Sequence, residues 1–337
     1  MVTLRDLAAA CGCSVTSASR ALKNSRSISK KLRERVHRAA MELGYIPNNI
    51  AGSMRTGMTN TIAVIMQDAM NPYYSIITTT VERRAAERGY NIIIITTGYK
   101  PERELNAVYE ALRKKVDGVL LFPIQQDTNA VEALIRAETP FVLVGRAFDD
   151  VLTDCVMPDD RQGAYLVTRH MLESGRRRLM MINSFRFISS SRLREAGFRQ
   201  AMAEFGLGVR DSDVHYIATD KGHCARLVQK VFSKKRDYDG ICCYCDVLAY
   251  EAYYQLKLMG LKVPDDVALT GVDDLHSYLT FPVPVTSAGY DIEGVARGSF
   301  DLLLEKIEHD RNGGAEKAPW QRRIVILNQH LAKGETT

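Results

Sequence analysis

The chain has 337 residues, 46% of them apolar and 25% charged, a composition that suits a soluble protein with two or three cores. Its net charge of +5 is unevenly distributed, because residues 1–58 carry ten basic and three acidic side chains, a charge of +7, which leaves −2 for the rest. The basic segment predicts binding to phosphates. The sequence shows no secretion signal and no apolar run long enough to span a bilayer, so we expect a cytoplasmic chain with no membrane partner.

Two short helices joined by a tight turn are predicted over Thr3–Leu22, which reads TLRDLAAACGCSVTSASRAL. Thr3 can cap the first helix together with Asp6, and Ser14 can cap the second. Gly12 between them suits the left-handed backbone that ends a helix. Apolar side chains recur at helical spacing along the first helix, at Leu4, Leu7, Ala8 and Cys11. The pattern indicates a helix-turn-helix unit, with an ordinary helical hairpin as the alternative.

The second of these helices has the features of a recognition helix for the DNA major groove. Small side chains cluster on one of its sides, and a hydroxyl and an arginine fall on the other. The candidate base contacts are Val15, Thr16, Ser17 and Arg20. A third helix is predicted between Ser29, as its cap, and Gly44, as its stop. Lys30 and Lys31 at its start are candidate phosphate contacts.

Several short motifs follow one another in a specific order and spacing. They are Leu4–Ala8, Ser14–Thr16, Ser19–Leu22, Arg33–Val36 and Leu43–Asn48, followed by Ile50–Ser53 and Arg55–Ile62. Together they resemble the headpiece and linker of the lac repressor (LacI/GalR) family. The resemblance implies an α/β protein with an N-terminal three-helix helix-turn-helix headpiece, a hinge, and a two-lobed, doubly wound domain like that of periplasmic binding proteins.

A hinge is predicted between the headpiece and the rest of the chain. Asn48–Arg55 can form one short helix, which would be unstable in water unless DNA or a partner orders it. In the family this helix enters the minor groove, and Met54 stands where an apolar side chain wedges open a base step. Arg55 beside it is a further candidate DNA contact. Gly52 lowers the helix propensity of the segment, so a flexible tether remains the alternative.

From Thr61 onward, buried apolar runs alternate with helical segments, most of them ten residues or longer. The predicted strands are Ile62–Met66, Asn91–Thr96, Gly118–Phe122 and Phe141–Val144 in a first series, and Leu179–Ile182, Val214–Ile217, Gly240–Tyr244 and Val267–Gly271 in a second. Such alternation indicates parallel, doubly wound sheets, one in each of two lobes.

The resemblance implies that the chain crosses between the lobes three times, near residues 158–161, 289–292 and 320–322. A helix over residues 291–312 would then return to the first lobe, and strand Ile324–Leu327 would belong to the second. The predicted domains are a headpiece over residues 1–46, a hinge over 47–60, a first lobe over 61–160 and 291–320, and a second lobe over 161–290 and 321–337.

Polar and aromatic side chains follow the strands at the carboxyl edge, where doubly wound sheets bind their ligands. The candidate effector contacts are Asp68, Asn71, Tyr73 and Arg146 in the first lobe, Ser190, Arg194, Asp246 and Asp273 in the second, and Tyr290 at a crossover. Carboxylate, amide and guanidinium groups can each form two hydrogen bonds to sugar hydroxyls, and aromatic rings stack on the sugar ring. Asp68 and Asn71 could instead cap the following helix. Arg194 and Asp273 have no evident structural role in the sequence.

Two positions depart from the family pattern. Sugar-binding members commonly carry Asp where Gly145 stands and Asn where Cys245 stands, so the usual contacts to sugar hydroxyls cannot be assumed. Three arginines, Arg146, Arg192 and Arg194, could instead favour a ligand with a carboxylate or phosphate group.

The resemblance implies a ligand-responsive, sequence-specific transcriptional regulator, a repressor that works as a homodimer on a near-palindromic DNA operator. Its effector would be a sugar, sugar acid or sugar phosphate. A periplasmic-type sugar-binding protein would share the two lobes, but it would need export and no basic head. An enzyme is the other alternative, yet the sequence has no phosphate-binding glycine loop, no G-x-S-x-G motif and no metal-ligand cluster. We therefore expect no catalytic residue, metal or cofactor.

The seven cysteines are odd in number and scattered, a pattern typical of a reduced compartment. Cys242 and Cys245 have the spacing of half a zinc or redox site, but no second pair and no nearby histidine completes it. Small buried side chains are the favoured interpretation of these thiols.

If Met54 wedges a base step, Met54→Ala should weaken operator binding while dimerisation and ligand binding stay unchanged. Operator binding should weaken because an inserted apolar side chain opens a base step and lets the DNA bend, so that more protein surface contacts it. Fluorescence anisotropy on a full operator measures it. Operator binding as tight as that of the parent would mean that the segment is only a tether.

Overall fold

The computed structural model describes residues 2–46, 58–233, 237–311 and 319–337. The chain forms two compact units, Met1–Thr59 and Asn60–Thr337, and each is described by itself. The predicted short helix over residues 48–55, with Met54 and Arg55, lies outside the described residues. No helix in the described ranges is long and apolar enough to cross a membrane.

The first unit contains three short helices, each begun by a side-chain cap. They are α1 (Leu4–Ala10), α2 (Val15–Leu22) and α3 (Lys30–Leu43). At the first of them, the Asp6 carboxylate accepts the Thr3 backbone N–H at 2.9 Å and the Thr3 hydroxyl accepts the Asp6 N–H at 3.3 Å, which is the predicted capping box. Ser14 and Ser29 cap the other two helices. These local signals are what the sequence predicted.

The core of this unit is small. Its central cluster of buried apolar side chains is Leu7, Cys11, Ala21, Val36 and Ala40, and Ala8 and Ala18 are also buried. Gly44 ends α3 with φ +62°, the left-handed conformation that glycine adopts most readily. So few buried side chains leave the unit marginally stable by itself, and its exposed surface stays available for a partner.

The second unit contains two six-stranded sheets. Sheet A has the strand order β11-β5-β4-β3-β1-β2, with all neighbouring strands parallel. Its strands are β1 (Thr61–Met66), β2 (Asn91–Thr96), β3 (Gly118–Leu121), β4 (Phe141–Val144), β5 (Cys155–Pro158) and β11 (Ile324–Leu327). Its helices are α5 (Pro72–Glu87), α6 (Pro101–Arg113), α7 (Asn129–Arg136) and α12 (Ile292–Arg311). We call this part of the unit the first lobe.

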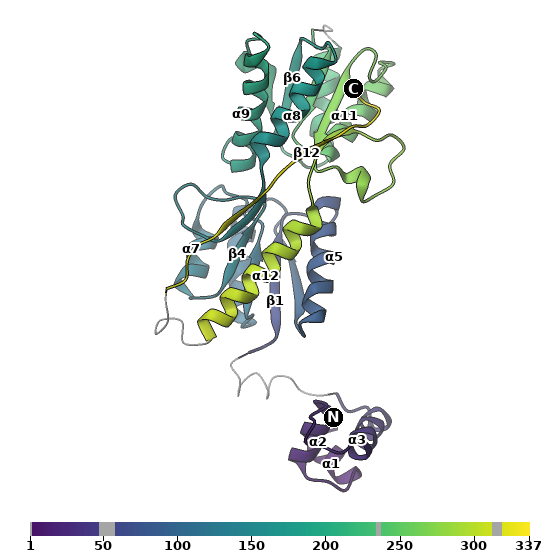
Figure 1. Ribbon diagram of the computed structural model, residues 1–337, viewed down its shortest axis with the longest axis vertical. Coiled ribbons are helices and arrows are strands. Elements are labelled where there is room, and N and C mark those ends of the chain that lie inside the picture. Colours follow the sequence, from purple (N-terminus) through teal and green to yellow (C-terminus); the bar gives the residue numbers. More distant parts are fainter. Residues whose placement is uncertain (1, 47–57, 234–236, 312–318) are drawn as a thin grey trace. The chain divides into compact units, whose positions relative to one another are not determined.

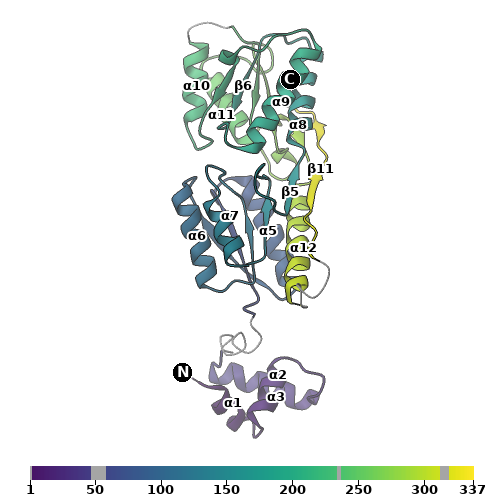
Figure 2. The same cartoon turned by 90° about the vertical axis from the view of Figure 1, so that its left-hand side faces the viewer.

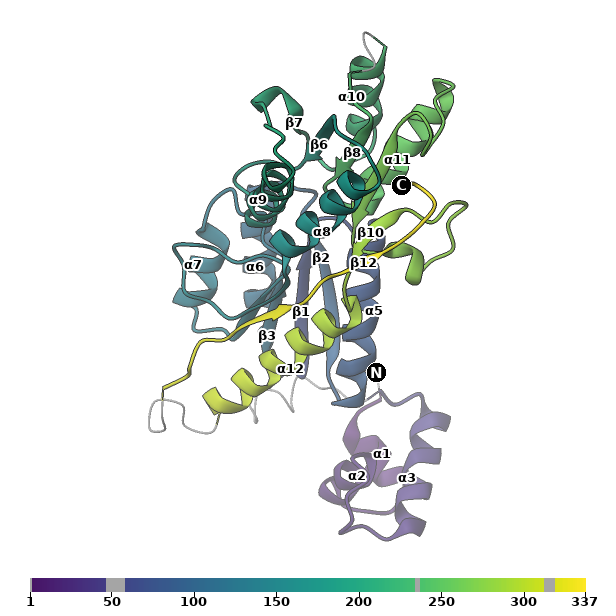
Figure 3. The ribbon, with the colours of Figure 1, turned by 45° about the horizontal axis from the view of Figure 1, so that its top comes forward.

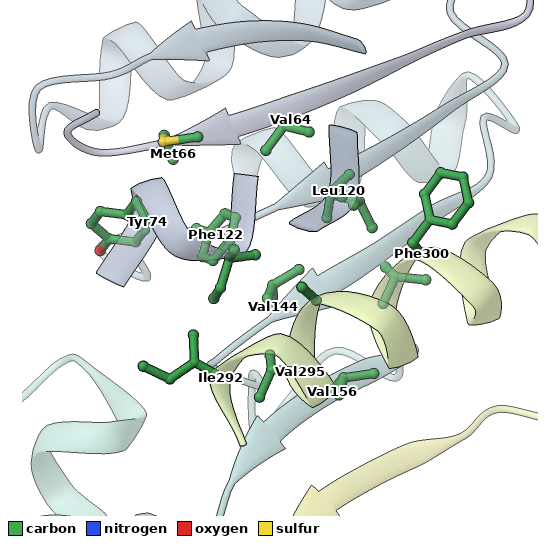
Figure 4. Packing of buried hydrophobic residues seen from close by; sticks show 14 of the residues in the cluster. Val64, Met66, Tyr74, Leu120, Phe122, Val144, Val156, Ile292, Val295 and Phe300 are labelled. Atoms are coloured by element: carbon green, nitrogen blue, oxygen red, sulfur yellow. The ribbon is translucent and has the colours of Figure 1, made fainter. Parts of the chain in front are cut away.

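Sheet A is covered on both faces because its strands alternate buried side chains to either side. Along β1, Ile62, Val64 and Met66 face α5 and α12, whereas Ala63 and Ile65 face α6 and α7. Figure 4 shows the first of these cores, in which residues from successive strands meet the side chains of α12. The labelled ones include Val64, Leu120, Val144 and Val156 from the strands, and Ile292, Val295 and Phe300 from the helix.

Sheet B, in the second lobe, has the order β12-β10-β9-β8-β6-β7, parallel except for the antiparallel edge strand β12. Its strands are β6 (Leu179–Asn183), β7 (Val214–Tyr216), β8 (Gly240–Cys243), β9 (Ala268–Val272), β10 (Thr286–Gly289) and β12 (His330–Ala332). Its helices are α8 (Asp160–Glu173), α9 (Ser189–Glu204), α10 (His223–Phe232) and α11 (Asp246–Leu258). The two sheets confirm the predicted doubly wound, two-lobed α/β architecture.

One predicted placement is wrong. Strand Ile324–Leu327 was expected in the second lobe, but it is β11 of sheet A, where Ile324 pairs with Cys155 and Leu327 with Pro158. Figure 2 shows β11 beside β5, next to α12. The chain passes to the second lobe only after Leu327, where the yellow end of the chain runs on to β12 in Figure 3. An apolar run carries no information about which of two sheets it joins, and its partner β5 was not predicted as a strand.

Candidate functional site

The exposed face of α2 carries most of the predicted base contacts. Ala18 and Ala21 are buried against the other helices, and Val15, Thr16 and Arg20 are exposed. Val15, an apolar side chain, is 41% exposed, which leaves it free to contact a thymine methyl group. This face therefore offers an apolar, a hydroxyl and a guanidinium group within two helical turns.

The remaining predicted DNA contacts of the headpiece lie at helix starts. Ser17 is half-buried, and its hydroxyl hydrogen-bonds the Ser14 hydroxyl at 2.8 Å, so it serves the cap of α2. Lys30 and Lys31 are exposed in the first turn of α3. Lys30 lies 4.0 Å from Glu34, and both of these side chains are more than half exposed. Such a pair is weak in water and leaves the ammonium group able to approach a phosphate.

The second unit encloses a cavity of about 50 Å³ where the carboxyl ends of the two sheets meet. Seven of the predicted effector contacts line it: Asn71, Tyr73, Arg146, Ser190, Arg194, Asp273 and Tyr290. Sequence reasoning missed an aromatic group that also lines it, formed by Tyr74, Tyr99, Phe122 and Tyr244. Tyr74 was hidden because it continues the apolar face of α5, and Tyr244 because it ends a buried strand.

Asp68 and Asp246, the other two predicted contacts, do not line this cavity. The Asp68 carboxylate accepts the Met70 N–H at 2.9 Å, which is a local turn contact. The Asp246 side chain is 1% exposed and accepts the Leu275 N–H at 2.8 Å and the Ser287 hydroxyl at 2.7 Å. Asp246 therefore ties the start of α11 to β10 and to the turn that follows β9, because a buried carboxylate needs such donors.

Asn71 has both of the roles considered for it. Its side-chain oxygen accepts the Tyr73 N–H at 3.0 Å, which caps α5. The same side chain also borders the cavity. The cap orients the first turn of α5, so that Tyr73 reaches the cavity as well.

Arg194 has a structural partner that the sequence did not reveal. Its Nε donates to the Asp160 carboxylate at 2.6 Å, and the two side chains are 6% and 1% exposed. Its Nη1 donates to the Tyr244 carbonyl, and its guanidinium carbon lies 4.4 Å from the centre of the Tyr244 ring. The pair joins α9 to the start of α8 and to the end of β8. Removing either charge would leave the other buried and unpaired.

Asp273 lies in a backbone conformation that side chains rarely adopt. Its φ is +113°, and the next residue, Asp274, has φ +52°. Its carboxylate accepts the Tyr290 hydroxyl at 3.0 Å, and burial raises its pKa to about 6. Strained, buried carboxyl groups of this kind concentrate at binding sites.

Direct hydrogen bonds join the two lobes beside the cavity. The Gln125 side-chain oxygen accepts the Ser189 N–H at 2.9 Å and the Ser189 hydroxyl at 3.1 Å. The Gln125 amide donates to the Ala147 carbonyl at 2.7 Å, which fixes it within the first lobe. Arg192 and Asp149 form an exposed ion pair across the same junction. The cavity of about 50 Å³ is smaller than an engineered protein cavity of about 150 Å³ that accepts benzene.

Glu104 supports the segment that carries Gln125. Its side chain is 4% exposed, and its carboxyl oxygen accepts the Ile124 N–H at 2.7 Å. Burial raises its pKa to about 7. The folded protein therefore binds a proton here over a range of pH in which the unfolded chain has lost it.

Buried thiols lie near one another in the second lobe, where the Cys243 side chain hydrogen-bonds that of Cys224 and burial helps to raise the pKa of Cys243. Cys242, Cys243 and Cys245 are buried and free, and no group of three His, Cys, Asp or Glu side chains among the described residues could hold a metal ion.

Comparison with known proteins gives matches over nearly the whole chain. Residues 3–48 match the family described as "Bacterial regulatory proteins, lacI family", and residues 59–319 match "Periplasmic binding proteins and sugar binding domain of LacI family". The chain is 27% identical over 313 residues to the HTH-type transcriptional repressor PurR of Haemophilus influenzae, covering 93% of each chain. It is 27% identical over 332 residues to PurR of Vibrio parahaemolyticus, covering 97% of this chain and 98% of that one.

Solved structures give the same result. A complex of the transcriptional regulator CelR with cellobiose matches with a TM-score of 0.74 and 25% identity, over 100% of both chains. The lac repressor dimer bound to its operator and the anti-inducer ONPF has the same fold, with a TM-score of 0.81 and 22% identity over 99% of this chain and 98% of that one.

Replacing Glu104 by Gln should flatten the pH dependence of stability. The pKa of Glu104 is higher in the folded protein than the value of about 4.3 in an unfolded chain. The free energy of unfolding gained from this group is therefore fully present at low pH and is lost as pH rises to about 7. Glu104→Gln keeps an acceptor for the Ile124 N–H, so its decline between pH 5 and 8 should be smaller by about 1–3 kcal/mol.

Urea unfolding at the two pH values measures this difference. Glu110→Gln, which changes an exposed glutamate of the same helix, is the matched control and should behave like the parent. Parallel pH profiles for the parent and Glu104→Gln would contradict the assigned pKa.

Proposed function

The chain belongs to the LacI family of bacterial regulatory proteins, and on that premise we propose that it represses transcription as a homodimer on a near-palindromic operator, with an effector bound between its lobes. The family membership makes it a DNA-binding, ligand-responsive regulator. The proposal adds which residues read the DNA, where the effector binds, and how the two events are coupled.

The single observation that carries the proposal is that one chain contains both a candidate DNA-binding unit and a separate unit with a candidate ligand cavity. A basic three-helix unit exposes Val15, Thr16 and Arg20 from one helix, and a distinct two-lobed unit encloses a cavity lined from both lobes. A cavity lined from both lobes favours a ligand that distinguishes one arrangement of the lobes from another. Only such a difference in affinity shifts a conformational equilibrium.

An exposed sheet edge supports the homodimer. β2 is the last strand of sheet A, and its central residues are four consecutive isoleucines. Ile94 on this strand is 50% exposed. Apolar edge strands are usually covered, since an open edge promotes aggregation. A second copy of the chain would cover it and would bring two headpieces to the two half-sites of an operator.

The alternatives considered from the sequence have less support. A transport-type binding protein has no use for a headpiece with capped helices and exposed base-reading side chains. The relatives named above are repressors, which favours a regulator over an enzyme. A repressor acts where the operator is, so we assign the chain to the cytoplasm. The effector is proposed to be a sugar, sugar acid or sugar phosphate.

The interlobe hydrogen bonds supply the switch. Gln125 holds the first turn of α9 through Ser189, and the cavity behind this contact is too small for a monosaccharide. We propose that a sugar-sized effector binds an arrangement in which this contact is broken. Coupling energies between such sites are typically about 1–3 kcal/mol, which changes operator affinity by about 5–150-fold.

Arg20→Ala should cost about 1–3 kcal/mol on an operator selected from random DNA and relax specificity at one base pair in each half-site, because its guanidinium is placed to bind a base edge. Lys31→Ala, the matched control, should weaken all sequences alike and reduce the salt dependence. Anisotropy titrations on operator and random DNA at one salt concentration measure both. Equal losses on the two DNAs for Arg20→Ala would refute the assignment of this residue.

Gln125→Ala should bind the effector about 3–10-fold more tightly, because two hydrogen bonds that oppose opening are lost. The probe is whichever sugar or sugar derivative stabilises the parent most in a thermal-shift screen, and calorimetric titration gives its affinity. Gln126→Ala changes the exposed neighbouring glutamine and should leave the affinity unchanged. Weaker binding by Gln125→Ala would mean that the effector favours the joined lobes.

A further inference from the structure

Three arginines lie at or near the mouth of the cavity, and two of them are already neutralised. Arg194 forms the buried ion pair with Asp160. Arg192 pairs with Asp149 at the rim, where both side chains are more than 40% exposed. Neither guanidinium therefore needs a ligand to balance its charge. The third arginine, Arg146, forms no such ion pair with a described residue.

Arg146 lines the cavity without a carboxylate partner among the described residues. Its Nη1 donates to the Pro123 carbonyl at 3.0 Å, and its Nη2 reaches the Tyr244 hydroxyl at 3.4 Å, a long hydrogen bond. A guanidinium has five N–H donors, and no further hydrogen bond joins the Arg146 side chain to a described residue. The charge of Arg146 acts on the buried carboxyl groups of Glu104, Asp160 and Asp273, but no ion pair within 4.0 Å joins it to any of them among the described residues. A bound anion would therefore be its direct charged partner.

The polar groups that surround Arg146 are phenols. Tyr244, Tyr74 and Tyr73 line the cavity together with Arg146, and the Tyr244 hydroxyl also hydrogen-bonds the Ser190 hydroxyl at 2.8 Å. A phenol donates a hydrogen bond to an anionic oxygen, and the free N–H groups of a guanidinium bind two such oxygens side by side. Gly145 makes this arrangement possible, because its φ is +77° and a Cβ there would lie 2.9 Å from the Tyr73 hydroxyl. The group of Arg146 and these tyrosines is therefore shaped for an oxyanion.

The opposite lobe offers the complementary group. Asp273 is the carboxylate among the described residues that line the cavity, and it accepts a hydrogen bond from the Tyr290 hydroxyl. Among the described residues, no ion pair within 4.0 Å joins the Asp273 carboxylate to Arg146. A carboxylate accepts hydrogen bonds from sugar hydroxyls. A ligand with an anionic end in the first lobe and hydroxyls in the second would satisfy both groups and touch both lobes.

We propose that the effector is a polyhydroxylated compound carrying one oxyanion, a carboxylate or a phosphate, which binds the Arg146 guanidinium, with its hydroxyls toward Asp273. This inference rests on the proposed function, because it names the class of effector for the same cleft. It narrows that class from sugars in general to sugar acids and sugar phosphates. Neutral sugars lack the charge that Arg146 requires.

The test compares matched probes on the full-length protein by thermal unfolding and calorimetric titration. One set is glucose, glucuronate and glucose 6-phosphate, a second is galactose, galacturonate and galactose 6-phosphate, and a third is ribose, ribonate and ribose 5-phosphate. We expect stabilisation only from charged members of these sets. Each set contains a sugar acid and a sugar phosphate. Whichever of these two binds more tightly shows whether the site prefers a carboxylate or a phosphate.

Three variants assign the effect to Arg146. Arg146→Gln should weaken the best anionic probe by about thirtyfold or more, the usual loss when one partner of a buried charge pair is removed. Arg146→Lys keeps the charge and should recover part of the affinity. Arg192→Gln, at the rim, should leave the ratio of anionic to neutral affinities unchanged. A cooperative thermal unfolding transition of Arg146→Gln without a probe, as sharp as that of the parent, establishes that this variant is folded.

The proposal is overturned if a neutral member of any set binds as tightly as its charged counterparts, if Arg146→Gln keeps the preference for anions, or if no member binds. Operator binding by the same preparations separates this failure from failure of the proposed function. If the protein binds its operator and responds to a neutral sugar, only the claim that the effector carries an oxyanion is contradicted. A chain that discriminates no DNA sequence contradicts the regulator itself.

Discussion

The buried ion pair between Asp160 and Arg194 fixes the geometry on which the cleft depends. Asp160 begins α8 directly after β5 of sheet A, at the point where the chain leaves the first lobe. Arg194 lies on α9 of the second lobe and also binds the Tyr244 carbonyl at the end of β8. One guanidinium thus ties the crossover to the helix and strand that carry Ser190 and Tyr244. Because breaking a buried pair is strongly unfavourable, we expect this corner of the cleft to keep its geometry if the angle between the lobes changes.

The contacts that join the lobes elsewhere are weaker and replaceable. Gln125 and Ser189 form neutral hydrogen bonds, and Arg192 and Asp149 form an exposed ion pair. Such interactions contribute little net stability, because water can take the place of either partner. The molecule therefore combines one strong anchor at the crossover with weak contacts at the cavity mouth. That distribution suits a hinge whose angle a ligand can set.

Sequence reasoning succeeded where the physics is local. Thr3 with Asp6, Ser14, Ser29 and Gly44 act within a few residues of their own positions, and each helix boundary they predicted is present. It failed where a partner lies far along the chain. Asp160 and Arg194 are 34 residues apart, and Gln125 and Ser189 are 64 apart, with no periodicity to connect them. The four apolar residues of Ile324–Leu327 fit either sheet equally well, so only the pairing with β5 decides.

Reciprocal linkage provides the most direct test of coupling between the cleft and the headpiece. If effector and operator binding bias one equilibrium between lobe arrangements, the operator must change effector affinity by the same factor as the effector changes operator affinity. The measurement is a calorimetric titration of the effector into the free protein and into the protein saturated with its operator, beside anisotropy titrations with and without effector. We predict equal factors in the range of about 5–150. An effector affinity that is identical on and off the operator would contradict the coupling.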